Sequence, residues 1–131
     1  MALRAKRSTT MRTRPQRSRT VAVVRDLGEA KAALAAAAAR RTPVTLLSPE
    51  GFAASGGALY FRALVAAAAR AVPTARYDAV IDCGDEPGRA LAALRMGFKT
   101  IRLGGRASAR RRVVEIAQKL GAAVLVRRPR D

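Results

Sequence analysis

Short apolar runs recur along the chain from Thr20 onward, and longer alanine-rich stretches separate them. The runs are rich in β-branched side chains and mostly continuous rather than alternating, which is typical of strands that are buried on both faces. Arg102 interrupts the fourth run and indicates an edge strand or a more exposed one. The pattern therefore predicts five short strands, at 21–24, 44–47, 79–81, 100–103 and 123–126.

The alanine-rich stretches between the runs have the composition and length of helices. Asp26 and Glu29 have the spacing of a capping box, and Asp85 lies just before a proline at the start of the third stretch. Gly97 and Gly121 fall where glycine commonly ends a helix. Four helices are predicted, at about 28–41, 57–72, 86–97 and 107–120.

Strands that alternate with helices predict an α/β domain whose strands run parallel, with right-handed crossovers. Leu34, Leu64 and Leu94 recur at a constant spacing, as repeated strand–helix units would produce. Two architectures fit: an open, doubly wound, flavodoxin-like sheet with helices on both faces, or half of a (β/α) barrel. Half a barrel would expose a long sheet edge unless two chains met. The open doubly wound sheet is preferred, because a domain of about 110 residues can fold alone in that form.

The first twenty residues differ in composition from the rest of the chain. They carry seven cations and no acid, among serines and threonines, and hold too little apolar surface to offset the entropy of ordering. We therefore expect a disordered basic tail at 1–20 and a single α/β domain at 21–131. The tail could be a polyanion-binding arm, a targeting leader similar to a transit peptide, or a solvated extension. Its cations are Arg4, Lys6, Arg7, Arg12, Arg14, Arg17 and Arg19.

The charge of the whole chain is also lopsided, with 26 Lys and Arg against 9 Asp and Glu, a formal charge of +17. Such a charge attracts polyanions such as nucleic acid. Aromatic residues make up 4% of the chain, which disfavours binding by base stacking. The chain has no His and a single Cys, Cys83, so we expect neither a zinc site nor an internal disulfide. A cytoplasmic protein without a membrane span or cofactor is the expectation.

Ligands of open parallel sheets bind beyond the carboxyl ends of the strands. The fourth run is followed there by two glycines and the start of a helix, where backbone N–H groups could close on an anion. Arginines in the first turn of that helix are unfavourable unless an anion accompanies them. The alternative is a plain glycine turn in which Ser108 caps the helix. The predicted ligand-binding residues are Gly104, Gly105, Arg106, Ser108 and Arg110.

The densest acidic cluster follows the third run, between Asp82 and Gly88. Asp82 or Asp85 at a strand end could hold a metal ion or act as a general base. The alternative is that Asp85 caps the next helix while Asp82 pairs with a nearby arginine. Burial and neighbouring carboxylates should raise the pKa of Cys83, which favours a small buried residue over a reactive thiolate.

Three functions are consistent with these patterns. We favour a small α/β domain that binds a phosphate- or carboxylate-bearing ligand at the carboxyl ends of its strands. The alternative is a basic accessory protein of nucleic acid or the ribosome, which would use the tail together with Arg111 and Arg112. A small enzyme that uses Asp82 or Asp85 is the third, and the sequence leaves open whether any reaction is catalysed.

Overall fold

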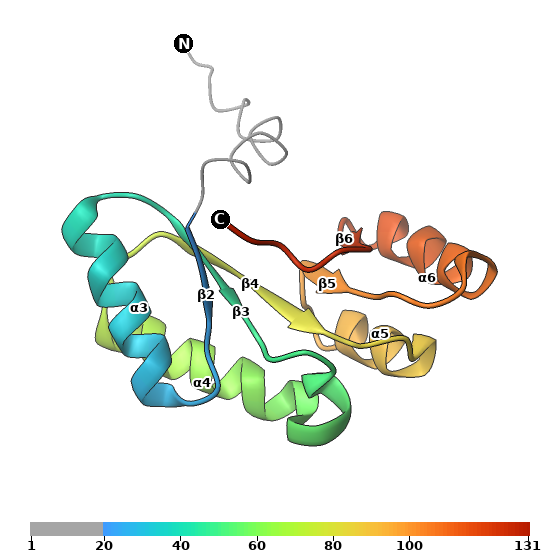
Figure 1. Ribbon diagram of the computed structural model, residues 1–131, viewed down its shortest axis with the longest axis horizontal. Coiled ribbons are helices and arrows are strands. Elements are labelled where there is room, and N and C mark those ends of the chain that lie inside the picture. The colour runs from blue at the N-terminus through green and yellow to red at the C-terminus, as the bar shows by residue number, and fades with distance from the viewer. Residues whose placement is uncertain (1–19) are drawn as a thin grey trace, which may run out of the picture.

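The structure is a computed structural model that describes residues 20–131, so the predicted tail lies outside the described residues except for Thr20. One sheet of five parallel strands alternates with four α-helices in this part of the chain (Figure 1). The predicted alternation is confirmed. The strands are β2 (Thr20–Val23), β3 (Val44–Leu47), β4 (Tyr77–Asp82), β5 (Thr100–Arg102) and β6 (Ala123–Leu125). The helices are α3 (Leu27–Arg40), α4 (Ala58–Ala71), α5 (Pro87–Arg95) and α6 (Ala107–Lys119), and a π-helical turn, η1 (Ala53–Gly57), precedes α4.

The strand order is sequential, β2-β3-β4-β5-β6, and every neighbouring pair is parallel. A doubly wound sheet needs a reversal in strand order, because right-handed crossovers in one direction place all helices on the same face. The preferred doubly wound, flavodoxin-like arrangement is therefore not the one observed. The sheet has instead the singly wound order of the alternative, half of a (β/α) barrel.

Helices cover one face of the sheet, and the main core lies between them. Leu46, Ile81 and Ile101 point into this core from three adjacent strands, and all are fully buried. Every helix contributes buried alanines to it, which let the helix backbone approach the sheet closely. Phe61 of α4 is its largest fully buried side chain and stacks on Phe98 at 6.2 Å between ring centroids.

The opposite face of the sheet, called here the second face, carries a mixture of polar and apolar side chains. Thr45 donates to Asp78 across β3 and β4 at 2.7 Å, and Leu47 and Val80 beside them are 1% exposed. No helix of the described chain packs there. Residues 126–131, called here the C-terminal segment, run back from β6 toward the start of β2 (Figure 1).

The helix ends follow the predicted caps only in part. The side chain of Asp26 accepts from the Glu29 N–H at 2.8 Å, so the predicted cap of α3 is confirmed. The residue before α5 is Glu86, and no side chain caps that helix. Asp85 is therefore not the predicted cap, because Pro87 fixes the start of the helix one residue later. None of the helices in residues 20–131 has the length and apolarity that a bilayer span requires.

Candidate functional site

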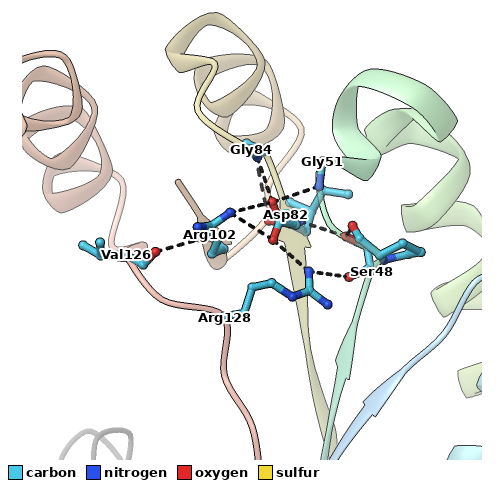
Figure 2. Close-up of polar contacts among 10 residues, drawn as sticks. Ser48, Gly51, Asp82, Gly84, Arg102, Val126 and Arg128 are labelled. Carbon is cyan, nitrogen blue, oxygen red and sulfur yellow. Dashed lines mark hydrogen bonds and ion pairs between the residues drawn. The ribbon is translucent and has the colours of Figure 1, made fainter. Parts of the chain in front are cut away.

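Asp82 occupies the last position of β4, and its side chain is completely buried (Figure 2). One carboxylate oxygen, Oδ1, accepts from the backbone N–H groups of Gly51 at 3.1 Å and Gly84 at 2.8 Å. The same oxygen lies 3.3 Å from Nη1 of Arg102 on β5. The other oxygen, Oδ2, accepts from Nη1 of Arg128 at 2.8 Å. Two loops, a neighbouring strand and the C-terminal segment thus meet on one carboxylate.

These contacts determine the charge state of Asp82. Burial alone raises the pKa of this carboxyl, because it disfavours the charged form. Hydrogen bonds from Arg128, Gly84 and Gly51 and the charge of Arg102 act in the opposite direction, and the net result is a pKa below the ordinary value. A carboxylate offers about four lone-pair positions, and donors occupy them. The predicted pairing of Asp82 with an arginine is confirmed, and this geometry gives its predicted catalytic or metal-binding role no support.

The same network connects the ends of the neighbouring strands. The fully buried hydroxyl of Ser48, just beyond β3, accepts from the Asp82 N–H at 2.9 Å. Arg128 also donates to the Ser48 carbonyl at 3.1 Å, and Arg102 Nε donates to the Val126 carbonyl at 3.0 Å. Arg102 does not mark an edge strand, because β5 lies between β4 and β6, but β5 is more exposed than β3, as the alternative expected. Arg102 is tolerated inside the sheet because it neutralises Asp82.

Cys83 follows Asp82 but points into the helix-side core, where it is 2% exposed. Burial raises the pKa of its thiol to about 12, and the charge of Asp82 adds to the increase. The expected raised pKa and buried position are confirmed. The thiol therefore stays protonated and unreactive near neutral pH.

Asp85 is exposed and lies beside the loop between β5 and α6. Gly105 of that loop has a φ of 80°, and a Cβ added there would come within 2.9 Å of the Asp85 Cβ. Gly104 donates its N–H to the Gly84 carbonyl at 2.8 Å, which joins the two loops. The close approach therefore explains the predicted glycine pair, while a catalytic role for Asp85 stays a prediction.

The predicted ligand-binding residues lie together at the start of α6. Arg106 is the residue before the helix, its side chain makes no capping bond, and the first turn holds no acid. Ser108 is exposed inside the first turn, so its alternative role as the cap is wrong. Arg110 Nη1 donates to the Gly105 carbonyl at 2.8 Å and draws its charge toward the loop. Backbone N–H groups 105–109 donate to no group within residues 20–131.

The structure describes some of the residues that were predicted to bind nucleic acid and not others. Arg111 and Arg112 are exposed on α6. The tail cations, Arg4 to Arg19, lie outside the described residues. Within residues 20–131, no three acidic, cysteine or histidine side chains are grouped so that they could hold a metal ion.

Fold and site together define a singly wound parallel α/β domain with an ion cluster at the carboxyl ends of its strands. No family model matches this chain, and no curated protein matches it. Its function must therefore be inferred from its own residues.

Proposed function

We propose that this domain binds a small anion, a phosphate or carboxylate group, at the start of α6. The observation that carries the proposal is the uncapped first turn of α6, where Arg106 and Arg110 accompany N–H groups that have no partner in residues 20–131. Helix N-termini attract anions through such N–H groups and through the helix dipole. Gly104 and Gly105 carry no side chains of their own, although Arg102 and Asp85 lie close to them.

The arginines themselves support the proposal. A cation in the first turn of a helix is unfavourable by about 0.3–1 kcal/mol, because it faces the positive end of the dipole. Arg110 lies in that first turn, Arg106 immediately precedes the helix, and Arg111 begins the second turn. A bound anion turns each of these repulsive contacts into an attractive one. Arg110 is held toward the loop by the Gly105 carbonyl, so less side-chain entropy is lost when it meets an anion.

A titration with inorganic phosphate, followed by phosphorylated metabolites, tests the proposal. We expect amide shifts in an NMR titration to concentrate at residues 105–109. The double variant Arg106→Ala, Arg110→Ala should lose binding, whereas Arg95→Ala, an exposed arginine in the last turn of α5, should keep it. Binding that survives the double variant unchanged would show that the anion lies elsewhere.

A substitution of Asp85 should change the affinity for phosphate in the opposite direction. Its exposed side chain starts beside Gly105, so its carboxylate repels an anion in the loop. Asp85→Asn should therefore tighten phosphate binding, and the effect should diminish as salt screens the repulsion. An unchanged affinity in Asp85→Asn would place the anion outside this loop.

One observation favours polyanion binding as a second candidate. Seven of the 26 cations lie in the first twenty residues, which leaves 19 cations against nine acids in the rest of the chain. The α/β domain is therefore strongly basic without the tail, and Arg111 and Arg112 are exposed on α6. Binding to duplex DNA or RNA should then be tolerant of sequence and weaken steeply with salt. The absence of binding at low salt would exclude this function.

A further inference from the structure

A hollow of about 650 Å³ lies between the second face of the sheet and the C-terminal segment. Arg128 attaches this segment to Asp82, and the Asp131 carboxylate accepts the Val21 N–H, so residues 127–131 form one wall. None of the residues proposed above to bind phosphate lines the hollow. Its lining is Val21, Val23 and Leu47 on the sheet and Arg127, Arg128, Pro129, Arg130 and Asp131 on the segment.

The floor of the hollow is aliphatic. Val21 and Val23 are two residues apart on β2, so their side chains lie on the same face of the sheet. Leu47 of β3 is the strand partner of Val23. Leu47 is buried, whereas Val23, the last residue of the edge strand β2, is 43% exposed. An apolar group that covered Val23 would remove this surface from water.

The wall of the hollow is cationic. Its lining holds three arginines and one aspartate. Arg128 is already engaged by Asp82 and Ser48. The side chains of Arg127 and Arg130 are joined by no hydrogen bond or ion pair to any group in residues 20–131, and both residues are exposed. An occupant therefore meets apolar surface on one side and, on the other, two arginines whose positive charge exceeds that of the single carboxylate of Asp131.

We propose that this hollow binds an aliphatic carboxylate, with its chain along Val21, Val23 and Leu47 and its carboxylate against Arg127 and Arg130. The volume lies within the roughly 300–1,000 Å³ that is usual for small-molecule sites. Guanidinium groups recognise carboxylates through paired hydrogen bonds. This site goes beyond the function proposed above, because it lies on the second face and needs no residue of α6.

The first test uses the full chain and a series of carboxylates: acetate, hexanoate, octanoate and decanoate, each below its micelle concentration. Affinity should increase with chain length, by up to about fourfold for each methylene that the hollow fully buries, and amide shifts should concentrate at Val21, Val23 and Leu47. Octylammonium, which has the same chain with a positive head, should not bind. An affinity that does not depend on chain length, or equal binding of octylammonium, would overturn the proposal.

The second test uses variants of the floor and the wall. Val23→Asp places a negative charge on the floor, and Arg127→Gln with Arg130→Gln removes the wall's free cations, so each should weaken octanoate binding about tenfold or more. Arg95→Gln, on α5, is the matched control and should bind as the wild type does. Val23 is partly exposed, so the fold should tolerate the change, and a circular dichroism spectrum checks it.

Octanoate and phosphate distinguish this proposal from the previous one. Arg106→Ala with Arg110→Ala should remove phosphate binding and leave octanoate binding unchanged. If those variants abolish octanoate binding instead, or if octanoate shifts the amides of residues 105–109, the carboxylate binds at α6 and the hollow is not its site. Failure of phosphate to bind would leave the octanoate result fully interpretable.

Discussion

At the scale of single residues, the buried charge of Asp82 organises the carboxyl ends of the strands. An isolated carboxylate in such a position would be too costly to bury, and Asp82 is accommodated because two arginines and two backbone N–H groups replace water around it. The sequence predicted the pairing of Asp82 with an arginine but not the particular partners. Arg102 and Arg128 are 20 and 46 residues away in the chain, so only the strand order brings them to Asp82.

The variant Asp82→Asn should be strongly destabilised. It removes both ion pairs while preserving the size of the side chain, and it leaves Arg102 and Arg128 partly buried without a counter-charge. We expect the free energy of unfolding to fall by about 2–4 kcal/mol, measured by urea denaturation. Asp85→Asn is the control, because Asp85 is exposed, and it should change stability by less than about 0.5 kcal/mol. Equal effects of the two variants would contradict the role given to Asp82.

The depressed pKa of Asp82 predicts how stability depends on pH. A carboxyl whose pKa is lower in the folded state binds fewer protons there than in the unfolded chain at acidic pH. Its stabilising contribution is present above the unfolded pKa of about 3.9 and is lost as pH falls through the folded value. The wild type should therefore lose melting temperature below about pH 4 more steeply than Asp82→Asn. Parallel profiles between pH 7 and pH 2.5 would contradict this assignment.

At the scale of elements, hydrophobic pattern and turn residues placed each strand and helix within about two residues of its observed bounds. The third strand was predicted too short, because it begins with the polar pair Tyr77 and Asp78, which lie outside the apolar run. The sequence left the strand order open, because an apolar run does not specify its neighbours, and the preferred doubly wound arrangement is not the one observed. Thr45, Asp78 and Arg102 lie on three neighbouring strands and share one face of the sheet. No helix of residues 20–131 packs on that face. This pattern is the signal that could have favoured the singly wound order.

The loop between β5 and α6 offers a test of local geometry with a built-in control. Gly105→Ala puts a Cβ at a positive φ and within 2.9 Å of the Asp85 Cβ, so stability should fall by about 1–2 kcal/mol. Gly88→Ala, near the start of α5, meets no atom within 4 Å and has an ordinary φ. That variant should raise stability by about 0.4–1 kcal/mol. Thermal unfolding of the two variants should therefore shift in opposite directions, and shifts of the same sign would contradict this geometry.

At the scale of the whole molecule, the C-terminal segment performs the part that a second layer of helices performs in a doubly wound sheet. It crosses the second face and is attached at Asp82 by Arg128 and at the edge of β2 by Asp131. The sequence did not predict this packing, because a short arginine-rich stretch without periodicity indicates no packed element.

Two deletions measure the contribution of the segment. Removal of residues 129–131 eliminates the contact with Val21 but preserves the pair between Arg128 and Asp82, so stability should fall by about 1 kcal/mol. Removal of residues 128–131 also leaves Asp82 without one of its two cations and should cost about 2 kcal/mol more. Chemical denaturation of both proteins gives the difference. Equal stabilities would mean that Arg128 does not hold the segment in place.

The basic residues before β2 provide the last prediction, which separates the two proposed functions. Deletion of residues 1–19 removes seven cations and no acid. If these residues act as a polyanion-binding arm, the melting temperature should not change, because they add little apolar surface to bury. Affinity for duplex DNA should fall, and its salt dependence should fall by up to roughly 6 units if every cation met a phosphate, at about 0.9 per contact. Such arms engage only some of their charges, so the measured change should be smaller.

A clear drop in melting temperature would instead show that the deleted residues pack on the domain. Unchanged stability and DNA binding, together with retained phosphate binding, would assign the function to α6 rather than to the arm.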